Sequence, residues 1–117
     1  MKRIFAAFYR MPYGKEPVHD WLIALPKPDR IIVGQDIATV EFGWPIGMPV
    51  CRSLRHGLFE VRSTIRNGKI EVRTYFAIEG DMMLLLHGQV GKSEQQAAIE
   101  LARKRLKDHH ARIGETK

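Results

Sequence analysis

The sequence predicts an α+β fold in the order β-α-α-β-β-β-α, with helices packed on a small twisted antiparallel sheet. Three observations predict it: an Asn-Gly turn between two strand-like segments, a third such segment directly after them, and three stretches whose apolar residues recur every three or four positions. The chain has 117 residues, of which 44% are hydrophobic. Such a chain can bury a core without disulfides, so we expect a single domain over residues 1–117.

The first 50 residues predict one strand and two helices. Residues 3–9, RIFAAFY, are apolar and aromatic, as strands commonly are. A helix begins near Pro17, because proline is tolerated in a first helical turn, and Pro26 breaks it. A second helix covers residues 29–42. The Gly- and Pro-rich segment 43–50 that follows is predicted to be a rigid loop.

The pair Asn67-Gly68 is the strongest turn signal in the chain, since both positions of a two-residue hairpin turn need a positive φ. It joins predicted strands at residues 57–66 and 69–78. If the residues on either side close the turn, the numbers of facing residues sum to 135.

A turn at residues 79–81 leads into a third strand, 82–90. With three residues in this turn, the numbers of facing residues on the second and third strands sum to 160. The last helix covers residues 94–110, and Ser93 with Gln96 fits a capping box at its start.

These registers predict a row of charged residues across the sheet, with Arg62 opposite Arg73, Arg73 opposite His87, and Tyr75 one step along. Like charges that face each other destabilise a strand pair. Two unit charges about 5 Å apart repel by roughly 3 kcal/mol at an effective dielectric constant of 20, and by less than about 1 kcal/mol in water. A sheltered pair of arginines therefore needs an anion between its members.

That anion has two interpretations. Glu71 lies diagonal to Arg62 and Glu60 lies diagonal to Arg73, so the face can be a solvated lattice of charges with no further task. Alternatively, the arginine forks bind a phosphodiester of RNA in a shallow groove, where cations stabilise the charge of the transition state and a histidine, tyrosine or glutamate transfers a proton.

The composition favours an anionic partner. The formal net charge is +6, from 19 Lys and Arg against 13 Asp and Glu, and the pI is about 9.8. Such an excess suggests nucleic acid or an acidic protein. The single cysteine, Cys51, indicates a reducing compartment. The longest apolar run, residues 82–86, is far too short for a membrane span. We therefore expect a cytoplasmic protein without a membrane segment, metal or cofactor.

Several motifs together resemble a known family. They are "GKEPVHDWLIALP", "FGWPIGMP", "RSLRHGLFEVRSTIRNGKI" and "LLLHGQVGKS" followed by "AIELARKRL". In this order, over residues 5–107, they resemble the phage Gp49-like, HigB-type branch of the RelE/ParE toxin superfamily. The resemblance implies the toxin of a type II toxin–antitoxin system that cuts messenger RNA in the ribosomal A site. It implies attack by the ribose 2′-hydroxyl without a metal, and a cognate antitoxin of the HigA type with a helix-turn-helix domain.

The resemblance also points to individual residues. Arg62, Arg73, His87 and Lys92 match basic positions of the family, and with Tyr75 they form the predicted catalytic set. A second set is predicted to bind RNA. Two of its members lead into the hairpin and three lie on the outward face of the last helix, where they aid docking by counterion release: Arg52, Arg55, Arg103, Lys104 and Lys107.

The sequence also departs from the family pattern. Relatives usually read "HGFxKK" and then a short Lys-Thr-Pro spacer, but here Gln89 replaces the aromatic residue, Gly91 replaces the first lysine, and the spacer is missing. Two alternatives stay open beside the nuclease. One is a ParE-like toxin that targets DNA gyrase, and the other is an inactive relative that only binds its antitoxin or nucleic acid.

Overall fold

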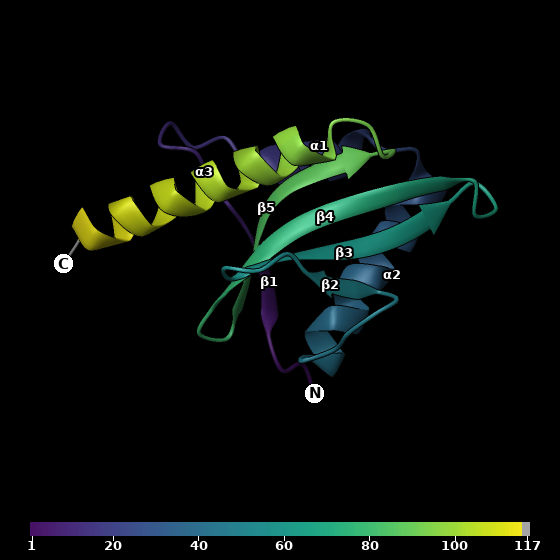
Figure 1. The fold of residues 1–117 in the computed structure, drawn as a ribbon, viewed down its shortest axis with the longest axis horizontal. Helices are drawn as coiled ribbons and strands as arrows, with labels where there is room; N and C mark the ends of the chain where they lie inside the picture. Colours follow the sequence, from purple (N-terminus) through teal and green to yellow (C-terminus); the bar gives the residue numbers. More distant parts are fainter. Residues whose placement is uncertain (116–117) are drawn as a thin grey trace.

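A computed structural model describes residues 1–115 of the protein. These residues form three helices and five strands (Figure 1). Along the chain the elements are β1 (Phe5–Phe8), α1 (Pro17–Ala24), α2 (Lys27–Gly43), β2 (Cys51–Ser53), β3 (Leu58–Ile65), β4 (Ile70–Glu79), β5 (Met82–Val90) and α3 (Gln95–Glu115). The predicted α+β class and the seven predicted elements are confirmed.

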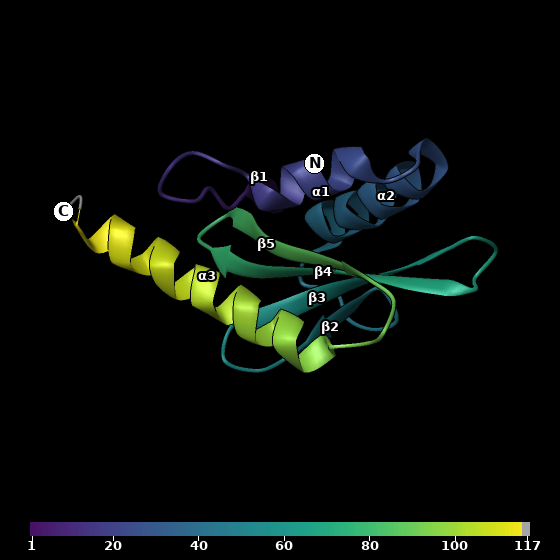
Figure 2. The same cartoon turned by 90° about the horizontal axis from the view of Figure 1, so that it is seen from above.

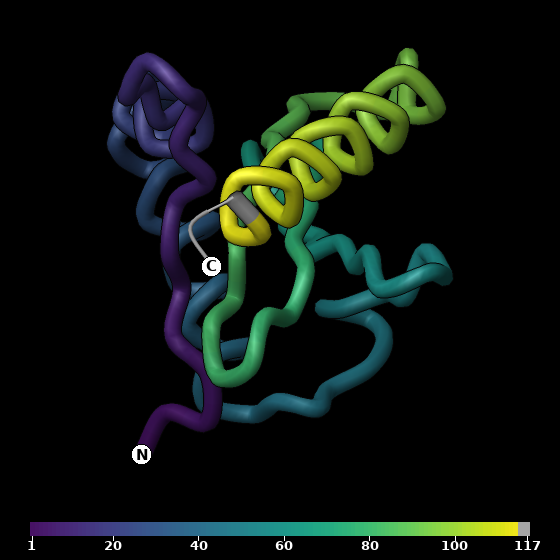
Figure 3. The backbone as a smooth tube through the Cα atoms, turned by 90° about the vertical axis from the view of Figure 1, so that its left-hand side faces the viewer, coloured from purple at the N-terminus to yellow at the C-terminus, as the bar shows by residue number. Residues whose placement is uncertain are grey.

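The five strands form one sheet in the order β1-β5-β4-β3-β2. The sheet is mixed, because β1 runs parallel to β5 while all other pairs are antiparallel. Figure 3 shows the N-terminal segment running alongside β5. The sequence did not predict β2, since three residues are too few to show a periodicity. It also could not show that β1, whose partner lies more than 70 residues away, joins in a parallel sense.

The predicted register of the first hairpin is confirmed. Arg62 pairs with Arg73, and the ladder ends at the pair Ile65 and Ile70. Arg66 and Lys69 close the turn as predicted, because the amide of Lys69 donates to the carbonyl of Arg66 at 3.3 Å. Arg66, Asn67 and Gly68 have φ angles of 52°, 59° and 78°. The left-handed conformation therefore begins one residue before the Asn-Gly pair.

The predicted register of the second hairpin is wrong. Glu79 pairs directly with Met82, so the turn has two residues instead of three. A further shift lies between Tyr75 and Phe76. Both changes move β5 in the same direction, and as a result Arg73 pairs with Gln89, while His87 pairs with Tyr75. A bulge inside a strand leaves no reliable mark in a sequence of continuous apolar residues.

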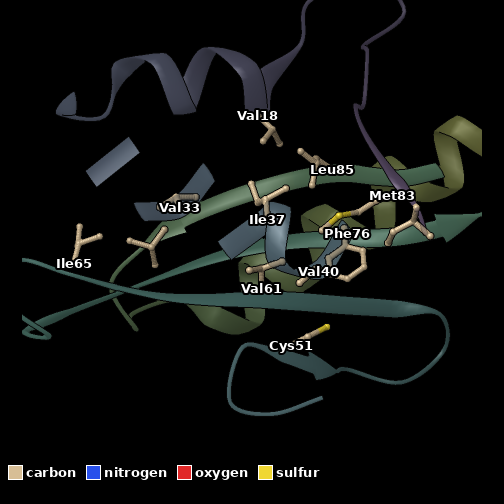
Figure 4. Packing of buried hydrophobic residues seen from close by; sticks show 12 residues of the cluster. Val18, Val33, Ile37, Val40, Cys51, Val61, Ile65, Phe76, Met83 and Leu85 are labelled. Atoms are coloured by element: carbon tan, nitrogen blue, oxygen red, sulfur yellow. The ribbon is translucent and has the colours of Figure 1, made fainter. Parts of the chain in front are cut away.

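The helices lie in two layers, with α1 and α2 on one face of the sheet and α3 on the other (Figure 2). Side chains from α1, α2 and the strands form the first core, with Val18, Val40 and Phe76 among its fully buried members (Figure 4). Trp21 of α1 packs so closely on β5 that a Cβ atom at Gly88 would lie 2.2 Å from the indole ring. Glycine is therefore required at this point of the strand.

A second core lies beneath α3, where Ala98 and Ala102 pack on Leu58, Tyr75 and Leu86. The two alanines let α3 approach the sheet closely, so the helix covers the part of this face that holds Tyr75. The start of α3 also differs, since the helix begins at Gln95 after a left-handed Glu94 with φ of 60°. Ser93 therefore does not take the predicted cap position. No helix within residues 1–115 has the length and apolar character needed to cross a bilayer.

Candidate nucleic-acid interface

Two rows of polar side chains cross the sheet on the face that α3 partly covers. Residues paired across strands point to the same face, so the register defines the rows. The first row, from β2 to β5, is Arg52, Glu60, Tyr75 and His87. The second row, from β3 to β5, is Arg62, Arg73 and Gln89. The predicted row of two arginines and a histidine is thus divided between neighbouring rows.

Arg73 is sealed inside the protein. Its side chain is 6% exposed, and its Nε donates a hydrogen bond to Glu60 Oε2 at 3.1 Å, while the Glu60 side chain is fully buried. Its Nη1 donates to the carbonyl of Gly91 at 3.1 Å. The Gln95 amide of α3 completes the enclosure by donating to Glu60 Oε1 at 3.4 Å. In this position Arg73 holds the strands and the start of α3 together, and it does not face solvent.

Three cations converge on the carboxylate of Glu71. Arg62 Nη2 lies 2.6 Å from Oε1, and Arg73 Nη2 and Lys92 Nζ lie 3.3 Å and 3.4 Å from Oε2. The hydrogen bond from Arg62, together with the charges of Arg73 and Arg62, holds the pKa of Glu71 below its ordinary value. The diagonal pairs expected from the sequence, Arg62 with Glu71 and Arg73 with Glu60, are therefore both present, and they explain how two arginines can face each other.

The Glu71 cluster, which we define as Glu71 with Arg62, Arg73 and Lys92, opens to solvent on two sides. Glu71 and Thr64 line both of two surface depressions. One has a volume of about 400 Å³ and includes Arg62, and the other has a volume of about 440 Å³ and includes Lys69 and Lys92. The side chains of Arg62 and Lys92 are 26% and 74% exposed. These two cations, unlike Arg73, can reach an external anion.

His87 and Tyr75 lie in a different setting, beneath α3. Their rings stack with centroids 6.0 Å apart. Tyr75 is fully buried and donates to Gln89 Oε1 at 3.0 Å, and burial, with the nearby charge of Glu60, raises its pKa to about 12. Arg105 Nη1 lies 2.8 Å from the carbonyl of Leu86 and 3.4 Å from His87 Nδ1. Burial and then the Arg105 charge lower the pKa of His87, so its imidazole is neutral near pH 7.

Four of the five predicted RNA-binding cations are exposed: Arg52, Arg55, Lys104 and Lys107. The fifth, Arg103, is not a free surface cation. Its Nη2 donates to the carbonyls of Leu54 and Arg55 at 3.0 Å and 3.2 Å, because α3 crosses the loop between β2 and β3. Its predicted outward position is therefore corrected, and its role is to fix that loop against the helix.

Sequence reasoning missed Arg105 altogether. Its spacing from Ala98 and Ala102 places all three residues on one helical face, and this spacing was the available signal. Cys51 is buried, and burial with the Glu60 charge raises the pKa of its thiol to about 11, so it is no nucleophile at neutral pH. Within residues 1–115, no group of three or more His, Cys, Asp or Glu side chains is placed to hold a metal ion.

The fold and the site define a small α+β domain that presents a cluster of basic residues at the open end of a mixed sheet. The sequence matches the family model of the phage-derived Gp49-like proteins (DUF891) over residues 20–107. The chain therefore belongs to the Gp49-like family, a branch of the RelE/ParE-like toxins, as its motifs predicted. A search of curated proteins gives no match.

Proposed function

We propose that this protein is the toxin of a type II toxin–antitoxin system and cleaves messenger RNA on the ribosome, so that translation stops. It acts in the cytoplasm, and a cognate antitoxin, of the HigA type with a helix-turn-helix domain, holds it inactive. The proposal extends the RelE-type toxin family membership of the chain. The observation that carries it is the convergence of Arg62 and Lys92 on one anionic group at the edge of two solvent-filled depressions.

The reaction that suits this site is attack of a ribose 2′-hydroxyl on the adjacent phosphorus. The 2′-oxygen loses its proton as it bonds to phosphorus, and the bond from phosphorus to the 5′-oxygen breaks as that oxygen takes up a proton. A 2′,3′-cyclic phosphate and a 5′-hydroxyl result. Because the nucleophile belongs to the RNA, no metal is required. Arg62 and Lys92 contribute by stabilising the charge that develops on the phosphate oxygens.

The remaining members of the predicted catalytic set take supporting roles in this proposal. Arg73 supports the site through its buried pair with Glu60, which holds β3, β4 and the start of α3 together. Tyr75 is too buried to reach a substrate, and it supports the ring of His87 by stacking. His87 accepts a hydrogen bond from Arg105 at Nδ1, so the proton of the neutral ring lies on Nε2 and is available as a hydrogen-bond donor.

A translating cell extract tests the proposal. Purified protein should cut messages at defined positions, mapped by sequencing of RNA ends, and both Arg62→Ala and Lys92→Ala should reduce cutting by about a hundredfold or more. Lys27→Ala, at the start of α2 on the opposite face, removes the same charge and should cut like the native protein. The proposal would be rejected if messages stayed intact in cells whose growth is arrested by expression of the protein.

One observation favours a second candidate, a relative without nuclease activity that binds its antitoxin or nucleic acid. Both guanidinium groups of the predicted row are already paired with carboxylates of the same chain. Expression without the antitoxin separates the candidates, because the inactive relative leaves growth unchanged. Growth arrest with DNA damage and intact messages would instead indicate a gyrase-targeting toxin.

A further inference from the structure

The Glu71 cluster holds more positive than negative charge. Arg62, Arg73 and Lys92 surround the single carboxylate of Glu71, and among the described residues 1–115 only Arg73 has a second carboxylate partner, Glu60. Each oxygen of Glu71 accepts from at least one cation: Arg62 at Oε1, and Arg73 and Lys92 at Oε2. This is the coordination that arginine forks and lysines give to a phosphate group.

The two carboxylates of the site, Glu60 and Glu71, differ in how easily their side chains can move away from the cations. Glu60 is fully buried, and both of its oxygens are bonded, to Arg73 and to Gln95. Glu71 is 19% exposed, and it lines both surface depressions. Its side chain can therefore swing into solvent without opening the core, and Arg62 and Lys92, which reach solvent themselves, would then face outward without an anion.

We propose that the carboxylate of Glu71 occupies the binding site of an RNA phosphate, and that a phosphodiester binds by displacing this carboxylate from Arg62 and Lys92. Glu71 is thus an internal competitor that weakens RNA binding until the ribosome presents the message at high local concentration. While Glu71 occupies this site, RNA cannot bind there. The apparent affinity for RNA is therefore the intrinsic affinity multiplied by the fraction of time that the site is free of Glu71. This inference rests on the proposed function for its biological meaning. Binding of the anion can nevertheless be measured separately from cleavage of RNA.

The test compares Glu71→Gln with the native protein by NMR titration, following the side-chain signals of Arg62 and Lys92. The probes are a 2′-O-methylated RNA trinucleotide, which lacks the attacking hydroxyl, and inorganic phosphate. Glu71→Gln should bind the trinucleotide about ten to a hundredfold more tightly, because it loses charged hydrogen bonds that compete with the ligand. If Glu71→Gln bound inorganic phosphate more tightly but its affinity for the trinucleotide were unchanged, the site would bind free phosphate. That result would overturn the assignment to RNA.

Asp81→Asn is the matched control, since it removes the same charge from an exposed turn at the opposite end of β4. At about 0.15 M ionic strength distant charges are screened, so its affinity should change by less than about twofold. Glu71→Asp keeps the charge on a shorter side chain and should bind with intermediate affinity, which excludes an unfolding artefact. Equal affinities for Glu71→Gln and Asp81→Asn would overturn the inference. Tight binding by Glu71→Gln without cleavage of any message would uphold it and reject the nuclease.

Discussion

The guanidinium of Arg73 and the carboxylate of Glu60 lie 3.1 Å apart, both are buried, and Gln95 at the start of α3 bonds to the Glu60 carboxylate. Across β3 and β4, Arg73 is paired with Arg62 and Glu60 is paired with Tyr75. The ion pair therefore links the two polar rows. Removal of one partner from a buried ion pair leaves an uncompensated charge, whereas an exposed pair contributes little. The two arginines that face each other across β3 and β4 therefore have different tasks.

Substitution of the two arginines should separate these tasks. Arg73→Met should lower the free energy of unfolding by about 3–5 kcal/mol, because Glu60 is left buried and charged. Arg62→Met should lower it by less than about 1 kcal/mol, since its side chain is partly exposed. Urea unfolding followed by circular dichroism measures both. As a control, Glu60→Gln combined with Arg73→Met should recover part of the loss. A loss for Arg62→Met as large as for Arg73→Met would contradict this division.

The contact between Trp21 and Gly88 predicts opposite effects of alanine at two glycines. In Gly88→Ala the new methyl group would lie 2.2 Å from the indole ring of Trp21, which is a steric clash. The free energy of unfolding should therefore fall by about 1–3 kcal/mol. Gly34→Ala, in the middle of α2, meets nothing within 4 Å and should raise it by about 0.5–1 kcal/mol through better helix propensity. Thermal unfolding of the two variants provides the comparison, and a neutral Gly88→Ala would show that α1 does not pack as described.

Arg105 should control the protonation of His87. Its charge is the second cause, after burial, of the lowered pKa of the imidazole. Arg105→Gln keeps a donor but removes the charge, so the pKa of His87 should rise toward its ordinary value of 6.5. NMR titration of the ring nitrogens reports this pKa, and it also reports the tautomer, which should carry its proton on Nε2. Lys104→Gln, one position earlier on the exposed side of α3, should leave the His87 titration unchanged.

Acid should destabilise the protein in two steps. The folded state lowers the pKa of His87 and His109, so the unfolded chain binds more protons as the pH falls below 6.5, and stability decreases. The folded state also lowers the pKa of Glu71 and Asp108, whose stabilisation is present above their ordinary values of 4.5 and 3.8 and is lost as the pH falls through the lowered values. Free energies of unfolding measured between pH 7 and pH 3 should show both losses, and a flat profile down to pH 5 would exclude the histidine step.

Alkali should destabilise it for the opposite reason. The pKa of Cys51 is raised from 9.0 to about 11 and that of Tyr75 from 10.0 to about 12. Both groups favour the fold while neutral, so their contribution is complete below the ordinary values and is lost as the pH rises through the raised ones. In Cys51→Ala the alkaline decrease should begin about one pH unit higher than in the native protein, near the ordinary pKa of tyrosine. An unchanged onset would show that the thiol takes no part.

The sequence by itself determined the local structure and the family. The Asn-Gly pair fixed the first hairpin register, and so it placed Arg62 opposite Arg73, because a turn of this kind is set by the backbone preferences of a few adjacent residues. Helical spacing and prolines located α1 and α2 for the same local reason. The motifs identified the Gp49-like family, since they record residue types at fixed positions.

Only the tertiary structure decided which of these residues can meet a substrate. The bulge in β5, where Leu86 has no partner in the ladder, and the shorter turn moved His87 from Arg73 to Tyr75. The approach of α3 enclosed Arg73 with Glu60 and left Arg62 and Lys92 at the surface. Exposure and ion pairing depend on elements that are far apart in the chain and on how closely their side chains allow them to pack. No periodicity within a single segment carries that information, because it arises only when the segments come together.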